Sequence, residues 1–272
     1  MSRIAVAGLG LIGGSLALAS GARGYDRDPQ ARRRARERGI EAADSLESAL
    51  ADADFVFLAV STAETPALLA EAAAARPGAL FSDCASLKVP VLRAAAMLPA
   101  SARFVGGHPM ASSRTRGLAG ADAGLFQDRP WALVPTARTD ERALASVGDL
   151  VTAIGAVPVV LDADTHDAAM TRVSHLPHAV SAALAAAADR NASPAVSRLA
   201  GPGLLDATRL AEAPMDLLLE LALADPRGLA DAISDVTQEL ASLAEALRRH
   251  DKPSIRAFFK RAAAARKSLL KD

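Results

Sequence analysis

The feature that most constrains the fold is a glycine-rich stretch near the start of the chain. "RIAVAG" is typical of a short buried strand, and Gly8, Gly10 and Gly13 follow in the spacing G-x-G-x-x-G where that strand ends. In this pattern the first glycine permits a tight turn, the second lets the backbone approach a pyrophosphate, and the third lets the next helix pack closely. That helix begins at Leu11 and Ile12, and its free N–H groups would face the phosphates. The stretch therefore predicts a dinucleotide-binding turn.

The same stretch has features of a secretory signal peptide. Arg3 supplies a positive charge, an apolar run follows it, and "ALAS" resembles a cleavage site. However, glycines would break the helical apolar region of a signal peptide. A second predicted strand, "ARGYD", also ends in an acid that this interpretation leaves unexplained. We therefore favour the nucleotide-binding interpretation.

Asp26 ends this second strand and is the expected partner of the adenosine ribose hydroxyls. It lies 18 positions after Gly8. The usual separation is about 20 or more, so the first helix must be short, about two to three turns. Arg27 stands beside Asp26, and the arginines at 32–34 either bind the 2′-phosphate of NADP or form the solvated face of the helix "PQARRRARERG". Because a carboxylate at the ribose would repel that phosphate, we expect NAD rather than NADP, with Asp26 and Arg27 in its site.

The charge and composition of the chain limit its partners. The 272 residues include 31 basic and 31 acidic side chains, and only 3% are aromatic, which disfavours a nucleic-acid surface. No apolar stretch after residue 20 runs long enough without charge to span a bilayer. Cys84 is the single cysteine, so neither an internal disulfide nor a cysteine-based metal site is expected. We expect a cytoplasmic protein that binds a small molecule, with no nucleic-acid or membrane partner.

The order of predicted elements indicates two domains. From Asp26 to about Asp164, short apolar strands alternate with helices of 10 to 15 residues, as in a doubly wound, mostly parallel α/β sheet. The remainder is Ala- and Leu-rich and helical, and "APMDLLLELALAD" is apolar on most of its circumference. We predict a Rossmann dinucleotide-binding domain over residues 1–162 and an all-α substrate and dimerisation domain over residues 163–272. The active site is expected in the crevice between them.

Two residues follow strands of the predicted sheet, at the edge that faces the cofactor. A histidine side chain ordinarily titrates near neutrality, so His108, in "GGHPM", could accept a proton from a substrate hydroxyl; alternatively it bonds a loop carbonyl. Ser86, in the loop after "ALFSD", could bridge His108, the substrate hydroxyl and the nicotinamide; alternatively it caps the next helix.

Two further stretches in the helical half carry polar side chains. In "SHLPH", His175 and His178 are three positions apart, and Pro177 is expected to loosen the turn between them. Only His166 lies near enough to join them, so we expect no metal. Arg209, in "DATRLA", has a planar guanidinium suited to a carboxylate, although an arginine on an apolar helix is often only solvated.

Taken together, "GLGLIGGSLAL", "GYDRDP", "SDCASLK", "GGHPMA", "SHLPH" and "DATRLA" resemble the prephenate/arogenate dehydrogenase family over essentially the whole chain. The resemblance implies NAD-dependent oxidative decarboxylation of prephenate to 4-hydroxyphenylpyruvate in tyrosine biosynthesis. It implies that His108 accepts the hydroxyl proton and that Arg209 binds a substrate carboxylate. It also implies that His178 contacts substrate, that His175 supports it, and that the helical domain forms a homodimer.

The chain departs from the family pattern next to His108. Where the family commonly reads "HPMAGSE", this chain reads "HPMASSR", with Arg114 in place of an acid. An arginine facing the substrate would repel the ammonium of arogenate and favour prephenate, whereas one facing water would have no effect on specificity. Arogenate dehydrogenation and a non-catalytic NAD(H)-binding paralogue therefore remain as alternatives. The hydroxyisobutyrate and 6-phosphogluconate dehydrogenases also pair such domains, but "SHLPH" and "DATR" have no obvious place in them.

Overall fold

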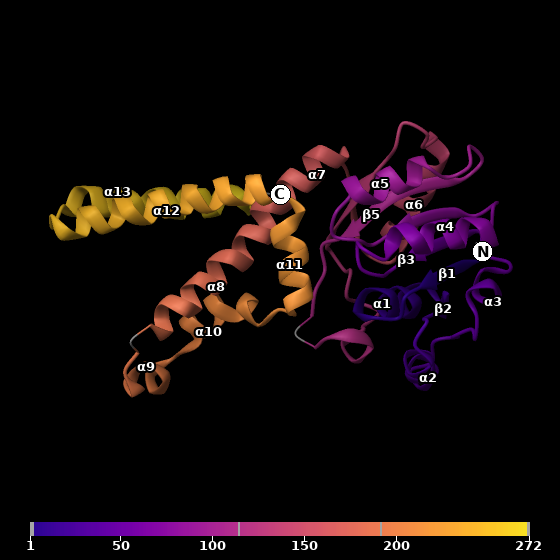
Figure 1. Ribbon diagram of the computed structural model, residues 1–272, viewed down its shortest axis with the longest axis horizontal. Coiled ribbons are helices and arrows are strands. Elements are labelled where there is room, and N and C mark those ends of the chain that lie inside the picture. Colours follow the sequence, from indigo (N-terminus) through magenta and orange to yellow (C-terminus); the bar gives the residue numbers. More distant parts are fainter. Residues whose placement is uncertain (1–2, 114, 191, 271–272) are drawn as a thin grey trace. The chain divides into compact units, whose positions relative to one another are not determined.

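The computed structural model describes residues 3–113, 115–190 and 192–270, and the chain divides into two compact units, residues 1–167 and 168–272. The first unit contains one seven-stranded sheet in the order β2-β1-β3-β4-β5-β6-β7 (Figure 1). Strands β1 to β5 are parallel, β6 runs antiparallel to β5, and β7 runs parallel to β6. The mostly parallel sheet confirms the predicted fold class. The strands are β1 (Ile4–Ala7), β2 (Arg23–Tyr25), β3 (Phe55–Leu58), β4 (Leu80–Asp83), β5 (Arg103–Pro109), β6 (Pro130–Val134) and β7 (Val157–Val160).

Several helices of the first unit begin at side-chain caps. Asp28 accepts a hydrogen bond from the Gln30 N–H at the start of α2, and Asp140 accepts one from the Ala143 N–H at the start of α6. The helices are α1 (Leu11–Ser20), α2 (Pro29–Glu37), α3 (Leu46–Leu50), α4 (Thr65–Ala75), α5 (Val89–Ala96), α6 (Glu141–Ala153) and the 3₁₀ helix η1 (Gly117–Gly120). The predicted alternation of strands and helices is therefore present, with the additional short helices α3 and η1, which are too short to show hydrophobic periodicity.

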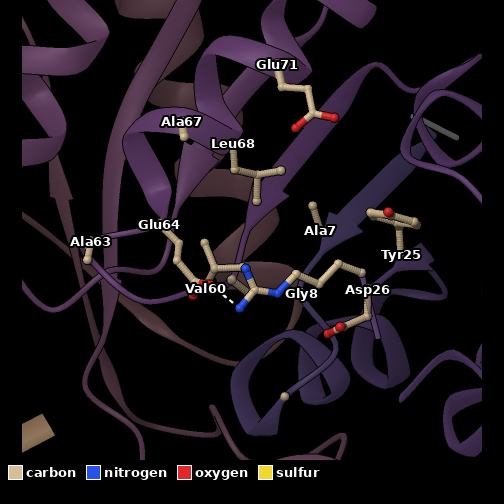
Figure 2. Close-up of a pocket in the computed structure, with 13 residues that line it drawn as sticks. Ala7, Gly8, Tyr25, Asp26, Val60, Ala63, Glu64, Ala67, Leu68 and Glu71 are labelled. Atoms are coloured by element: carbon tan, nitrogen blue, oxygen red, sulfur yellow. Dashed lines mark ion pairs between the residues drawn. The ribbon is translucent and has the colours of Figure 1, made fainter. Parts of the chain in front are cut away.

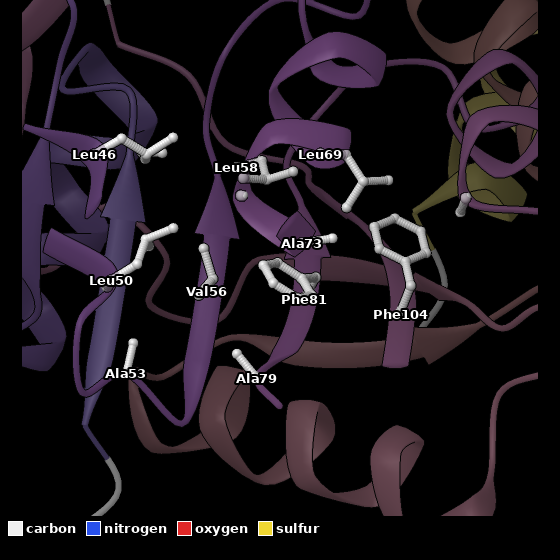
Figure 3. Close-up of a cluster of buried hydrophobic side chains, with 14 of the residues drawn as sticks. Leu46, Leu50, Ala53, Val56, Leu58, Leu69, Ala73, Ala79, Phe81 and Phe104 are labelled. Atoms are coloured by element: carbon white, nitrogen blue, oxygen red, sulfur yellow. The ribbon is translucent and has the colours of Figure 1, made fainter. Parts of the chain in front are cut away.

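Alternate residues of the central strands belong to two different cores. Val56 and Leu58 pack with α3, α4 and α5 on one face (Figure 3), whereas Phe57 packs with α1 and α6 on the other. Because both faces of the sheet are covered, these strands are apolar at nearly every position instead of alternating with polar residues. The two cores hold the strand ends, and the loops that follow them, in a fixed register.

The regular elements in the described part of the second unit are all helices. Its elements are the end of α7 (Ala163–Met170), the π-helical segment η2 (Thr171–His175), α8 (Leu176–Asp189), α9 (Pro194–Leu199), α10 (Pro202–Thr208), the 3₁₀ helix η3 (Arg209–Glu212), α11 (Met215–Ala224), α12 (Pro226–Arg248) and α13 (Lys252–Leu269). This confirms the predicted all-α second half. None of the helices in the described part of the chain is both long enough and apolar enough to cross a bilayer.

The π-helical segment accounts for the loosened turn predicted near Pro177. Proline has no N–H, so the Val173 carbonyl, four residues earlier, cannot receive an α-helical hydrogen bond from it. The Leu176 N–H instead bonds the Thr171 carbonyl, five residues earlier, which is the π-helical pattern. The helix axis continues, but the side chains after this point are rotated relative to a regular α-helix.

Candidate active site

The three glycines of the first turn have different structural environments. Gly8 has a φ of +99°, and a Cβ there would collide with the Ala59 carbonyl oxygen. A Cβ at Gly13 would collide with the Gly8 carbonyl oxygen, so this glycine lets α1 pack against the turn. A Cβ at Gly10 would meet nothing within 4 Å. Gly8 and Gly13 are therefore required by the fold, whereas Gly10 faces open space.

That open space adjoins the N-terminus of α1. The helix begins at Leu11, and Gly10 is its N-cap, so no cap side chain covers the first N–H groups. Free N–H groups and the positive end of the helix dipole attract phosphate. Leu11 and Ile12 supply backbone there, but their side chains are not part of the cavity described next.

A cavity of about 600 Å³ lies beside the glycine turn (Figure 2). It is lined by Ala7, Gly8, Gly10, Tyr25, Asp26, Arg27, Ala59, Val60, Ala63, Glu64, Ala67, Leu68 and Glu71. The Asp26 carboxylate is held at this cavity because Oδ2 accepts from the Leu9 N–H at 2.8 Å and Oδ1 from the Asp28 N–H at 2.9 Å. α1 has 10 residues, so the short crossover still brings Asp26 to the cavity. The Asp26 carboxylate, the backbone at Gly8 and Gly10 and the apolar lining side chains together fit the adenosine half of a dinucleotide.

The arginines near Asp26 form hydrogen bonds or ion pairs with other groups of the protein. Arg32 donates to the Asp26 carbonyl at 2.7 Å, Arg33 pairs with Glu37 at 3.2 Å, and Arg34 pairs with Asp28 at 3.5 Å. None of the three is among the described residues that line the cavity. Arg33 and Arg34 therefore fit the interpretation of an exposed, ion-paired face, whereas Arg32 is half-buried and bonds the Asp26 and Arg27 carbonyls. Asp26 remains the candidate group to bind a ribose.

A fully buried ion pair ties the end of β4 to β5. Asp83 and Lys88 are both inaccessible to solvent, and Lys88 Nζ donates to the Asp83 carboxylate and to the Gly107 carbonyl. Asp83 Oδ1 also accepts from the Gly107 N–H at 3.0 Å. These bonds hold both backbone groups of the residue before His108. Burial, together with the Asp83 charge, raises the pKa of the Cys84 thiol, so this cysteine is not a nucleophile at neutral pH.

Ser86 lies in the same loop and does not cap the next helix. The N-cap residue of α5 is Lys88, and the N–H groups of Lys88 and Val89 each donate to the Asp167 carboxylate at 2.8 Å. The alternative that Ser86 serves as the helix cap is therefore wrong, because an acid from α7 takes that role. Ser86 is half-buried, and its Oγ lies 3.2 Å from Thr62 Oγ1.

His108 lies within β5, whereas the sequence predicted that it follows the strand. Strand β5 continues to Pro109 because β6 pairs with it in antiparallel register, placing His108 opposite Ala132. The imidazole is buried, and its Nδ1 lies 3.0 Å from Nε2 of His166. The carboxyl ends of parallel strands meet at one sheet edge, so His108 shares an edge with the glycine turn.

His166 and Asp167 are the site residues that the sequence did not reveal. His166 Nδ1 lies 2.7 Å from Asp167 Oδ1, and His166 is 2% exposed. Burial by itself raises the pKa of the Asp167 carboxyl. Hydrogen bonds from His166 and from the backbone of Val89 and Lys88 outweigh it and lower that pKa. The sequence indicated His166 only as a possible zinc ligand, and no local signal relates it to a histidine 58 positions away.

The remaining candidate residues belong to the helical unit. His175 ends the π-helical segment and is buried, while His178 is half-buried on α8 with Nδ1 2.8 Å from the Ser174 carbonyl oxygen. Arg209 is exposed and begins η3, which packs against α8. Arg114 lies outside the described residues.

Both halves of the chain match one protein family. Residues 19–160 match "Prephenate dehydrogenase, nucleotide-binding domain", and residues 162–261 match "Prephenate dehydrogenase, dimerization domain". The chain is 32% identical over 273 residues to the prephenate dehydrogenase of Bacillus subtilis, covering 95% of this chain and 74% of that protein.

Two solved structures are similar to this chain along nearly its whole length. The prephenate dehydrogenase from A. aeolicus in complex with hydroxyphenyl propionate and NAD+ is similar with a TM-score of 0.88 and 26% identity, covering 99% of this chain and 98% of that one. The Synechocystis arogenate dehydrogenase is similar with a TM-score of 0.81 and 27% identity, covering 98% and 100%. The resemblance drawn from the sequence motifs is confirmed: the chain belongs to the prephenate dehydrogenase family.

Proposed function

We propose that the chain catalyses the NAD-dependent oxidative decarboxylation of prephenate to 4-hydroxyphenylpyruvate, a step of tyrosine biosynthesis. The observation that carries the proposal is a buried imidazole, His108, at the same sheet edge as a dinucleotide turn and an acid-bearing adenosine cavity. Family membership and the NAD+ of the A. aeolicus structure support the cofactor. Prephenate is favoured over arogenate because the Bacillus subtilis relative is a prephenate dehydrogenase.

In the proposed reaction His108 removes the proton of the substrate hydroxyl and later returns it to the product oxygen. When bound, NAD accepts a hydride from the ring carbon that carries the hydroxyl. His108 takes the proton of that hydroxyl as its carbonyl forms. The bond to the ring carboxylate then breaks, carbon dioxide leaves, and the electron pair enters the ring. The product oxygen becomes a phenol by recovering the proton from His108, so the histidine ends in its starting state and no net proton is released.

Residues of the helical unit are proposed to bind the substrate. Arg209 presents an exposed guanidinium suited to a carboxylate, and the half-buried His178 presents an imidazole, with buried His175 supporting it. Ser86 is proposed to hydrogen-bond the hydroxyl that reacts, and Arg114 to disfavour the ammonium of arogenate.

We also propose that the chain acts as a cytoplasmic homodimer. On α11 only Leu221 is buried, whereas Met215, Leu219 and Leu223 are 66%, 51% and 69% exposed. Apolar side chains exposed along one helix indicate a surface that another chain covers. The match to a dimerisation domain supports this partner, and the single cysteine suits a reducing compartment.

The decisive experiment is NADH formation by purified protein given NAD with prephenate or with arogenate. Prephenate turnover that falls by about 10²- to 10⁴-fold in His108→Asn would support both the reaction and the role of this histidine. Arg209→Ala should raise KM for prephenate about 10- to 100-fold, the loss of a charge-assisted hydrogen bond, with KM for NAD unchanged. NAD binding without turnover of either substrate would overturn the proposal in favour of a non-catalytic NAD(H)-binding protein.

A further inference from the structure

We propose that His166 and Asp167 are positioning residues that hold His108 in the tautomer whose Nε2 carries no proton. The three side chains form one line of contacts, from His108 Nδ1 to His166 Nε2 at 3.0 Å and from His166 Nδ1 to Asp167 Oδ1 at 2.7 Å. The kinetic consequence of this proposal rests on the proposed function. The tautomer itself does not, because it exists without substrate.

Asp167 determines the direction of every hydrogen bond in the line. Its Oδ1 accepts from the Lys88 N–H and its Oδ2 from the Val89 N–H, each at 2.8 Å. Backbone N–H groups only donate, so the carboxylate is held as an ionised acceptor. The lowered pKa of the Asp167 carboxyl agrees with this state. A group that only accepts requires its remaining neighbour to be a donor.

His166 must therefore carry its proton on Nδ1, facing Asp167. When His166 is neutral its other nitrogen is then an acceptor, and His166 Nε2 receives the proton of His108 Nδ1. This leaves His108 Nε2 unprotonated, which is the form a general base needs. The opposite arrangement would place the lone pair of His166 Nδ1 2.7 Å from a carboxylate oxygen. For a side chain that is only 2% exposed, water could not relieve that repulsion.

Two acids and one lysine adjoin this line of contacts. Asp167 reaches the line from α7, and the buried Asp83–Lys88 pair reaches it from the β4 side through Gly107. That pair is neutral overall, and Asp167 is in direct contact with His166.

The first test uses the ligand-free protein and needs no turnover. Nitrogen-15 NMR of histidine-labelled protein at neutral pH distinguishes a protonated ring nitrogen from an unprotonated one. The expected spectrum assigns the His108 proton to Nδ1 and the His166 proton to Nδ1. A His108 proton on Nε2 would overturn the proposal. If the expected tautomer is found but prephenate is not turned over, the proposed function fails and this inference stands.

The second test compares a conservative variant with a disruptive one. In Asp167→Asn the NH2 group opposes a backbone N–H in either amide orientation, because Oδ1 accepts from Lys88 and Oδ2 from Val89. In the orientation that faces His166, the amide donates to His166 Nδ1, which reverses both bonds and puts the His108 proton on Nε2. We expect kcat to fall about 10²- to 10⁴-fold, as when a triad acid is replaced by its amide, with KM for NAD unchanged. His166→Phe breaks the line without reversing it, so part of the population keeps Nε2 unprotonated and the loss of kcat should be smaller.

If His166 and Asp167 had only a structural role, His166→Phe should lower kcat more than Asp167→Asn, because phenylalanine is the larger disturbance of a buried site. Finding His166→Phe more damaging to kcat than Asp167→Asn, when the NMR spectrum of Asp167→Asn shows the His108 proton on Nε2, would therefore contradict the proposal. Asp164→Asn is the matched control, since the same exchange in the first turn of α7 falls on an exposed side chain. The NMR measurement on the unaltered protein decides the question even where a variant does not fold.

Discussion

Arg27 Nη2 lies 2.6 Å from Glu64 Oε1, and this ion pair crosses the edge of the nucleotide cavity (Figure 2). The two side chains come from the loop after β2 and from the residue before α4. Their side chains are 83% and 40% exposed, so the pair contributes little to folding stability. Its significance lies in its position beside Asp26, where the ribose of a dinucleotide is expected.

The preference for NAD over NADP should depend on Asp26, Arg27 and Glu64. Asp26→Ser should raise KM for NAD about 10- to 100-fold, because hydrogen bonds to a charged acceptor are lost. Adding Glu64→Gln should lower KM for NADP, because Arg27 is released to meet a 2′-phosphate. Steady-state kinetics with both cofactors measures the two effects. Unchanged KM for NAD in Asp26→Ser would show that this carboxylate does not contact the ribose.

Substitutions at two glycines of the first turn should have different effects, Gly8 on stability and Gly10 on NAD binding. Gly8→Ala should lower the free energy of unfolding by at least about 1–2 kcal/mol, because alanine is strained at positive φ and its methyl would strike the Ala59 carbonyl. Gly10→Ala should leave stability unchanged, because its methyl enters open space, but should weaken NAD binding at least about 10-fold where the pyrophosphate approaches. Urea unfolding and titration calorimetry measure these effects. Equal NAD affinity in Gly10→Ala and the unaltered protein would exclude a phosphate at this turn.

The buried Asp83–Lys88 pair should matter for stability far more than an exposed one. Lys88→Met leaves a buried carboxylate without its cation and should reduce the free energy of unfolding by about 3–5 kcal/mol. Adding Asp83→Asn removes the unpaired charge and should restore part of that loss. Arg33→Met is the control, because the Arg33–Glu37 pair is 83% and 60% exposed and its loss should not be measurable. Equal effects of Lys88→Met and Arg33→Met in urea unfolding would contradict this account.

Oligomerisation should depend on the exposed face of α11. Glutamate in place of Leu219 and Leu223 would put two charges into the proposed apolar subunit contact. We expect the double variant to sediment as a monomer in analytical ultracentrifugation at concentrations where the unaltered protein is a dimer. Met97→Glu is the matched control, because Met97 is an apolar residue of the first unit with 86% exposure. If the double variant remains dimeric, the subunits meet through another surface.

Much of the fold is already determined by local sequence. The strand "RIAVAG" followed by Gly8, Gly10 and Gly13 predicts the nucleotide turn because the residue types match the backbone geometry at each position. Apolar runs such as "DFVFLAV" predict strands covered on both faces, and the Ala- and Leu-rich second half predicts helices. These signals are readable because secondary structure depends on neighbours within about ten positions along the chain.

The surroundings of the reactive groups depend on the tertiary structure. No spacing in the sequence relates His108 to His166, or Asp167 to the N–H groups at the start of α5, since β6, α6 and β7 intervene between them along the chain. The length of β5, and hence the place of His108 inside it, depends on an antiparallel partner that the predicted parallel pattern does not include. The sequence by itself determined which residues are chemically competent. Only the packing of distant segments decided which nitrogen, oxygen and backbone groups meet, because hydrogen bonds depend on distances of a few tenths of an ångström.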